Sequence, residues 1–236
     1  MCRIFFNLTF FNKISLQNMP PILIKWRTYF LVLMIMASLG VFYFIQKGTT
    51  VEIVVSKIIV SIFFTLYFFE TLKKSNYALS VSLLLFFLST ILFTVESKSV
   101  IGMFLLFFYR MTLMKVVLNR KVDWKLFLTV FLIAISIMSL LFVLVFKNTL
   151  FYYLSISTTL VLIGLISLAF TNIISRSSPK NVLFFIAIAL FVACDTIFGV
   201  KKLEIADNIN IVIGTACYYI SFFLIVKSRE LEPFND

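Results

Sequence analysis

Among the acidic residues of this chain, Asp195 is the one whose apolar surroundings most strongly indicate a functional site. It is the only charged residue in the stretch 184–198, which reads FFIAIALFVACDTIF. A charge at bilayer depth costs about 3 kcal/mol on insertion scales, so an acid that is kept there usually has a partner and a function. Lys57 and Arg110 also lie inside apolar stretches and are the candidate partners. The three charges together predict an ion-paired polar centre.

Several kinds of chemistry are excluded by what the sequence lacks. The chain has no histidine, which removes His-based triads, His-ligated zinc and His general bases. Its three cysteines, Cys2, Cys194 and Cys217, form neither a disulfide framework nor a metal-binding spacing such as C-x-x-C. We therefore expect no metal and no cofactor.

The elements that must position the charges are membrane-spanning helices. With 62% hydrophobic and only 13% charged residues, and a mean hydropathy of +1.10, the chain has too little polar surface for a soluble globule. Its apolar segments are long and continuous, as in spanning helices, and do not alternate as barrel strands do. We predict an all-α, polytopic membrane protein, a bundle of eight transmembrane helices. They are expected at residues 28–45, 51–69, 77–94, 100–118, 124–146, 149–171, 181–200 and 209–226.

The positive charge predicts the orientation of this bundle. The predicted connections are short, so we expect one membrane domain (28–226) between an N-terminal segment (1–27) and a tail (227–236). With the N-terminus inside the cell, fourteen basic residues fall on the inner side and five on the outer side, namely Lys47, Lys98, Lys147, Lys201 and Lys202. Because positive charge concentrates in cytoplasmic loops, we predict a multi-pass protein of the cell membrane with both termini in the cytoplasm. The net charge of +11 thus reports topology, and no nucleic-acid partner is expected.

This orientation places the intramembrane charges at similar depths. Lys57 and Asp195 fall in the outer halves of their helices, and Arg110 falls near the middle of its own. Polar residues of neighbouring helices fall in the same layer, namely Ser56, Ser89, Thr90, Tyr218 and Tyr219. We therefore expect one cavity lined by the second, third, fourth, seventh and eighth predicted helices. Within it, Asp195 should lie within salt-bridge or one-water reach of Lys57 or Arg110.

Each of these residues also has a purely structural interpretation. Asp195 could be half of a structural ion pair, and Lys57 could reach the outer interface along its alkyl stem. Arg110 is too deep for that, which favours pairing or phosphate binding. Tyr218 and Tyr219 could serve only packing and lipid contact.

Two stretches before the midpoint of the chain carry a resemblance to a known sequence pattern. Residues 56–59 (SKII) are similar to Thr-Lys-Pro-Leu and keep its lysine, Lys57, although Ile58 replaces the proline. Gly102 is followed eight residues later by Arg110, where the pattern has glycine and then histidine at that spacing.

Two further stretches extend the resemblance to the C-terminal helices. Residues 191–203 (FVACDTIFGVKKL) are similar to Phe-x-x-Ser-Asp-Ser-x-x-Ala-x-Asn-Lys-Phe, with Asp195 at the aspartate. Residues 218–222 (YYISF) resemble Tyr-Tyr-Leu-Ala-Gln. On these residues the chain resembles the YhhN-like, or lysoplasmalogenase, family of eight-helix membrane proteins.

The resemblance implies an ether-lipid hydrolase. Members of the family hydrolyse the vinyl-ether bond of lysoplasmalogens, which would make Asp195 a catalytic acid and base. A lysophospholipid from the membrane would be the partner, and the residues that bind it would be Lys57, Arg110, Tyr218 and Tyr219. The reaction protonates an alkene carbon, and water then attacks the oxocarbenium ion. It therefore calls for a carboxylic acid and for a carboxylate that positions the water or stabilises the cation.

One departure from the family pattern bears on this chemistry. The family carries a Gly-Asp pair in its third helix, where residues 86–92 (FFLSTIL) offer Ser89 and Thr90. Thr90 is then the second candidate catalytic residue, because it could orient a water, but it cannot offset positive charge as a carboxylate does. Glu96 could substitute if the outer end of this helix folds inward. The alternative function is a non-catalytic protein of the same fold that binds a lysolipid or a fatty aldehyde.

Overall fold

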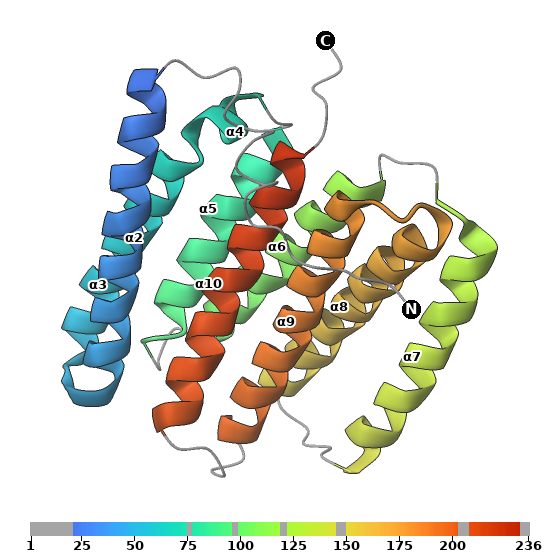
Figure 1. The fold of residues 1–236 in the computed structure, drawn as a ribbon. Coiled ribbons are helices and arrows are strands. Elements are labelled where there is room, and N and C mark those ends of the chain that lie inside the picture. The colour runs from blue at the N-terminus through green and yellow to red at the C-terminus, as the bar shows by residue number, and fades with distance from the viewer. Residues whose placement is uncertain are drawn as a thin grey trace, which may run out of the picture.

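The fold is a bundle of helices (Figure 1). The computed structural model describes residues 21–74, 77–95, 99–118, 122–144, 150–202 and 208–231, and every regular element within these ranges is a helix. Eight of them have 16 residues or more, which agrees with the predicted number of helices. These eight are α2 (Pro21–Lys47), α3 (Thr50–Tyr67), α5 (Tyr77–Leu92), α6 (Ser99–Leu118), α7 (Trp124–Leu144), α8 (Leu150–Ser175), α9 (Pro179–Lys202) and α10 (Asn208–Glu230). A short helix, α4 (Phe69–Lys74), lies between α3 and α5.

The first and last helices are longer than hydropathy predicts. α2 begins at Pro21 and α10 continues to Glu230, so residues 21–27 and 227–230 are helical. Proline suits the first turn of a helix, where its missing N–H has no helical partner. Backbone hydrogen bonds also continue past the last apolar side chain, which a hydropathy pattern does not record. Residues 1–20 and 232–236, which include Cys2, lie outside the described part of the chain.

The second predicted helix, 51–69, corresponds to α3, and a further short helix follows it. α3 starts after Thr49, which caps it: the Thr49 hydroxyl accepts from the amide of Glu52, whose carboxylate accepts from the amide of Thr49 at 2.7 Å. It breaks at Phe68, where the amide still bonds the Phe64 carbonyl at 3.1 Å. α4 follows directly, so the polar connection expected from residue 70 is helical as far as Lys74.

The helices pack in a row of neighbours with α2 and α3 at one edge and α7 at the other (Figure 1). α7 packs on α8, which packs on α6 and α9. α10 packs on α9 and also reaches α2 and α4, so it joins the two ends of the described chain. The start of α2 and the end of α10 consequently lie at the same end of the bundle (Figure 1).

Aromatic rings fill the centre of the bundle. We call this set the aromatic core, and its rings come from α3, α5, α6, α9 and α10: Phe64, Phe86, Tyr109, Phe191, Tyr218 and Phe222. The Phe86 ring stacks on Phe222 with centroids 4.7 Å apart and on Tyr218 at 5.8 Å. At this level the five helices expected to line a cavity are joined by packed rings. A lipid-sized cavity lined by the same helices stays a prediction.

The surface and the helix lengths are those of a multi-pass membrane protein. Among the described residues, five segments are long and apolar enough to cross a membrane: Trp26–Lys47, Thr50–Tyr67, Ser99–Val117, Tyr153–Ser175 and Ile211–Glu230. Large apolar side chains on α2, including Trp26, Met36 and Tyr43, are more than half exposed, which suits contact with lipid tails. The predicted all-α, polytopic class is confirmed.

Candidate functional site

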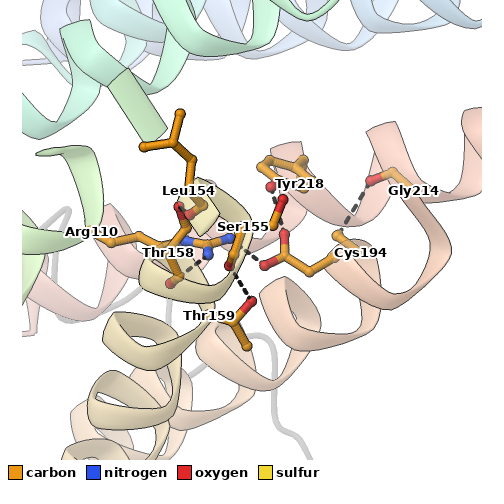
Figure 2. A network of polar contacts seen from close by, with 9 residues as sticks. Arg110, Leu154, Ser155, Thr158, Thr159, Cys194, Gly214 and Tyr218 are labelled. Carbon is orange, nitrogen blue, oxygen red and sulfur yellow. Dashed lines mark hydrogen bonds and ion pairs between the residues drawn. The ribbon is translucent and has the colours of Figure 1, made fainter. Parts of the chain in front are cut away.

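Asp195 on α9 is paired as the sequence predicts. One carboxylate oxygen forms an ion pair with the guanidinium of Arg110 on α6, and the other accepts a hydrogen bond from the hydroxyl of Tyr218 on α10 at 2.8 Å. Figure 2 shows Arg110 and Tyr218 converging from separate helices. We call these three residues the Asp195 centre.

Arg110 is anchored by a third helix. Its Nη1 donates to the backbone carbonyl of Thr158 on α8 at 3.0 Å (Figure 2). A helical carbonyl can accept this second bond because it has two lone pairs. The Thr158 hydroxyl is turned to its own helix, where it donates to the carbonyl of Leu154. The contact with Thr158 could not be predicted from the sequence, because a backbone carbonyl is present at every position.

The two charges of the Asp195 centre differ in access. The Arg110 side chain is 2% exposed, whereas the Asp195 side chain is 25% exposed. Asp195 therefore remains reachable from outside the protein while its partners are fixed in the interior.

Hydroxyl groups near the Asp195 centre are not all satisfied. Tyr109 and Tyr219 are buried, and their hydroxyl oxygens have no hydrogen-bond partner among the described residues. Tyr109 packs against Phe191 and belongs to the aromatic core. Tyr219 thus shows no bond to the Asp195 centre, unlike its neighbour Tyr218, and its substrate-binding role stays a prediction.

Lys57 is brought to a different place from Asp195. Its ammonium donates to the backbone carbonyl of Thr90 in α5 at 2.8 Å and to the hydroxyl of Thr94, in the turn that follows α5, at 2.7 Å. The Thr90 hydroxyl donates to the carbonyl of Phe87 within its own helix at 2.9 Å. Lys57 therefore bonds the backbone of Thr90, whereas Asp195 forms its ion pair with Arg110. Glu96, the alternative acid, lies outside the described residues.

The two serines expected in this layer, Ser56 and Ser89, are both buried. Ser89 is fully buried, and its hydroxyl donates to the Phe86 carbonyl at 2.7 Å. Ser56 is buried on α3, next to Lys57.

Among the residues whose side chains are described, no three of His, Cys, Asp and Glu lie close enough together to hold a metal ion.

A second buried acid, which the sequence analysis assigned to the tail, lies where α2 begins. Glu230 of α10 forms ion pairs with Arg27 of α2 and with Lys227, and it accepts a hydrogen bond from Thr71 of α4 at 2.6 Å. We call these four residues the Glu230 clasp. Lys227 and Glu230 are three residues apart, a spacing at which side chains of one helix contact each other, and this spacing could have indicated their ion pair. The clasp holds three helices together.

Comparison with known protein families, with curated proteins and with solved structures found no match. The functional assignment therefore rests on the residues of this chain and on the geometry of the Asp195 centre.

Proposed function

We propose that this membrane protein binds a lysophospholipid at the Asp195 centre. The observation that carries the proposal is the accessible carboxylate of Asp195, fixed by the buried Arg110 and by Tyr218. A carboxylate that is held in place and still reachable is suited to accept hydrogen bonds from a ligand.

The chemistry of a lysophospholipid matches such an acceptor. A lysolipid has a free hydroxyl on its glycerol, which a lipid with two chains lacks, and an ethanolamine headgroup adds an ammonium. Both groups are donors that a carboxylate can accept. A buried or desolvated site that bonds a ligand hydroxyl discriminates strongly against the analogue without it. We therefore expect Asp195 to favour one-chain over two-chain lipids.

Hydrolysis of the vinyl-ether bond is the second candidate. It is favoured by the Tyr218 hydroxyl on the accessible Asp195, because a carboxylate with a neighbouring hydroxyl can orient and deprotonate water. The lysoplasmalogenase resemblance also implies this reaction. Thr90, at the position of the family's other aspartate, bonds within α5 and meets Lys57. The described contacts of Asp195 therefore include no second carboxylate, which is why we place binding first.

One experiment separates the two candidates. The purified protein in lipid nanodiscs is titrated with a lysoplasmenyl ethanolamine lipid, and both binding and fatty-aldehyde release are measured. Saturable binding without aldehyde supports a binding protein, and aldehyde release that disappears in Asp195→Asn supports a hydrolase. Failure to prefer this lipid over a two-chain ethanolamine lipid, together with no aldehyde, would refute both.

We further propose that the bundle lies in the cell membrane with both ends in the cytoplasm. The ion pair between Arg27 and Glu230 supports an even number of crossings, because it joins the first and last described helices at one end of the bundle. The excess of basic residues on that side supports the cytoplasmic assignment. Reporters inserted after Gly48 and after Arg176 should report opposite sides, with Arg176 inside the cell. An external reporter at Arg176 would reverse the orientation.

A further inference from the structure

Basic side chains gather at the end of the bundle where α2 begins and α10 ends. α6 and α8 also end there, and α7 and α9 begin there (Figure 1). The opposite end has one acid, Glu52, and the basic residue Lys47, with Lys57 about two turns further along α3. Among the residues whose side chains are described, the basic end has two acids, Asp123 and Glu230, and seven basic residues: Arg27, Lys115, Lys125, Arg176, Lys180, Lys227 and Arg229.

Both described acids at this end are already engaged. Glu230 forms its ion pairs with Arg27 and Lys227 in the Glu230 clasp. The carboxylate of Asp123 accepts a hydrogen bond from the amide of Leu126 at 3.2 Å, which caps the start of α7. Outside the clasp, five described basic residues therefore share this end with one described acid. We call these five residues the basic rim: Lys115, Lys125, Arg176, Lys180 and Arg229.

Helix packing brings the basic rim together. Its residues belong to α6, α7, α8, α9 and α10, and α8 packs on α6, α7 and α9. Packed helices lie about 8–10 Å apart. Arg229 extends from α10 to the last turn of α6, where its guanidinium donates to the Val116 carbonyl at 2.8 Å, beside Lys115. The fold thus places positive charge from five helices at one end of the bundle.

Aromatic side chains place this end at the level of lipid headgroups. Trp26 begins the apolar span of α2 and is 59% exposed, and Trp124 begins α7 and is 61% exposed. Tyr77, the first residue of α5, is 80% exposed. Tryptophan and tyrosine are enriched where a membrane meets water. Because Lys125 follows Trp124 directly, we expect the basic rim to lie at this depth.

We propose that the basic rim binds anionic phospholipids, whose headgroups have a phosphodiester and no cationic group, as in phosphatidylglycerol. Basic residues clustered at the end of a membrane-spanning bundle attract such lipids. The guanidinium groups of Arg176 and Arg229 can each pair with two phosphate oxygens. The acyl chains of a lipid hold its phosphate at the depth of the rim, which a soluble anion cannot do.

This lipid site is distinct from the Asp195 centre. Lys180 and Asp195 are both on α9, fifteen residues apart, which is about 22 Å along a straight helix. The proposal therefore does not depend on lysolipid binding, nor on the side of the membrane that this end faces.

The test uses lipids with brominated acyl chains, which quench a tryptophan that they contact. The full chain with Trp26→Phe, which leaves Trp124 as its one tryptophan, is placed in nanodiscs of equal parts phosphatidylcholine and phosphatidylglycerol. The bromine is carried by one lipid or by the other. We expect a preference for phosphatidylglycerol of about threefold or more, reduced by high salt. Equal quenching by both lipids, or a preference abolished by inorganic phosphate at constant ionic strength, would overturn the proposal.

Lysine variants in the same background test whether the rim causes the preference. Lys115→Gln combined with Lys125→Gln removes two exposed charges of the rim and should lower the preference by about twofold or more. Lys47→Gln removes an exposed charge at the opposite end and should leave the preference unchanged. An unchanged preference in the double variant, or an equal loss in Lys47→Gln, would contradict the assignment of the lipid to the basic rim.

Discussion

The Asp195 centre and the Glu230 clasp are built from similar parts and differ in how far they are closed. Each has a carboxylate, an arginine from another helix and a hydroxyl partner. The Glu230 side chain is 5% exposed and bonds Arg27, Thr71 and Lys227. The Asp195 side chain is 25% exposed.

Glu230 is enclosed as a structural acid is, whereas Asp195 is open enough to contact a ligand. The Glu230 carboxylate is enclosed by groups from three helices, and Arg27 also lies over the Tyr67 ring at 4.6 Å. Such a cluster stabilises helix packing and leaves little of the carboxylate accessible to another molecule. An unpartnered arginine Nε does not distinguish the two sites, because both Arg27 and Arg110 show one among the described residues. The two sites differ in how accessible the carboxylate is.

The largest effect is expected for Arg110→Leu. It leaves Asp195 without its ion-pair partner at membrane depth, and breaking a buried pair costs about 3 kcal/mol or more. Unfolding in mixed micelles should show this loss, and the double variant with Asp195→Leu should recover much of it because no charge is left unpaired. If the double variant is no more stable than Arg110→Leu, the ion pair is not the source of the effect.

Glu230→Gln should cost less and should leave the lipid site intact. The amide cannot form ion pairs with Arg27 and Lys227, and charge-assisted hydrogen bonds are worth about 2 kcal/mol. The free energy of unfolding should fall by about this amount, while lysolipid affinity stays unchanged. A large loss of affinity at unchanged stability would assign the clasp to function and break the comparison.

Tyr218→Phe tests how much the Tyr218 hydroxyl contributes to stability, and Tyr219→Phe provides a matched control. Tyr218 donates to Asp195, so its loss should lower stability by about 1.5 kcal/mol. Tyr219→Phe removes a buried hydroxyl with no partner among the described residues and should be neutral. Thermal unfolding of the two variants side by side measures the difference. Equal effects would mean that the bond from Tyr218 to Asp195 contributes nothing.

Thr94→Val should have a smaller effect than Arg110→Leu, Glu230→Gln and Tyr218→Phe. It removes one acceptor of Lys57 and should cost about 1 kcal/mol, whereas Thr65→Val, at an exposed hydroxyl bonded within its own helix, should cost less. If Lys57 serves only to join α3 and α5, lysolipid affinity should not change. A drop in affinity of about tenfold, or 1.4 kcal/mol, would place Lys57 in the lipid site after all.

Hydropathy predicted the depth of each charge but not its neighbours around the bundle. The fold class, the eight long helices and the pairing of Asp195 with Arg110 follow from the cost of exposing polar groups to lipid. Lys57 was predicted at a similar depth and yet bonds the Thr90 carbonyl of α5, because the lateral order of helices is set by side-chain packing. The aromatic core belongs to this packing, and phenylalanines that face lipid and phenylalanines that face other helices look alike in sequence.

Contacts formed by the backbone, and contacts between helices that are distant in the sequence, could also not be predicted from the sequence. The Thr158 carbonyl that anchors Arg110 has no sequence signature. The hydrogen bond from the Cys194 thiol to the Gly214 carbonyl depends on how α9 and α10 are rotated. The helical extension to Glu230 was missed because its polar residues resemble a tail, although they continue the hydrogen-bonding pattern of α10.

The affinity of a lysophosphatidylethanolamine for the protein in nanodiscs, measured for Asp195→Asn and Glu230→Gln in parallel, shows whether the Asp195 carboxylate binds the lipid. The amide of Asp195→Asn keeps the shape of the side chain but loses the charge that strengthens a bond to a ligand donor. We predict that Asp195→Asn weakens binding by about tenfold or more, equivalent to 1.4 kcal/mol, while Glu230→Gln binds like the unmodified protein. Unchanged affinity in Asp195→Asn, or an equal loss in both variants, would contradict the assignment of the accessible carboxylate to function.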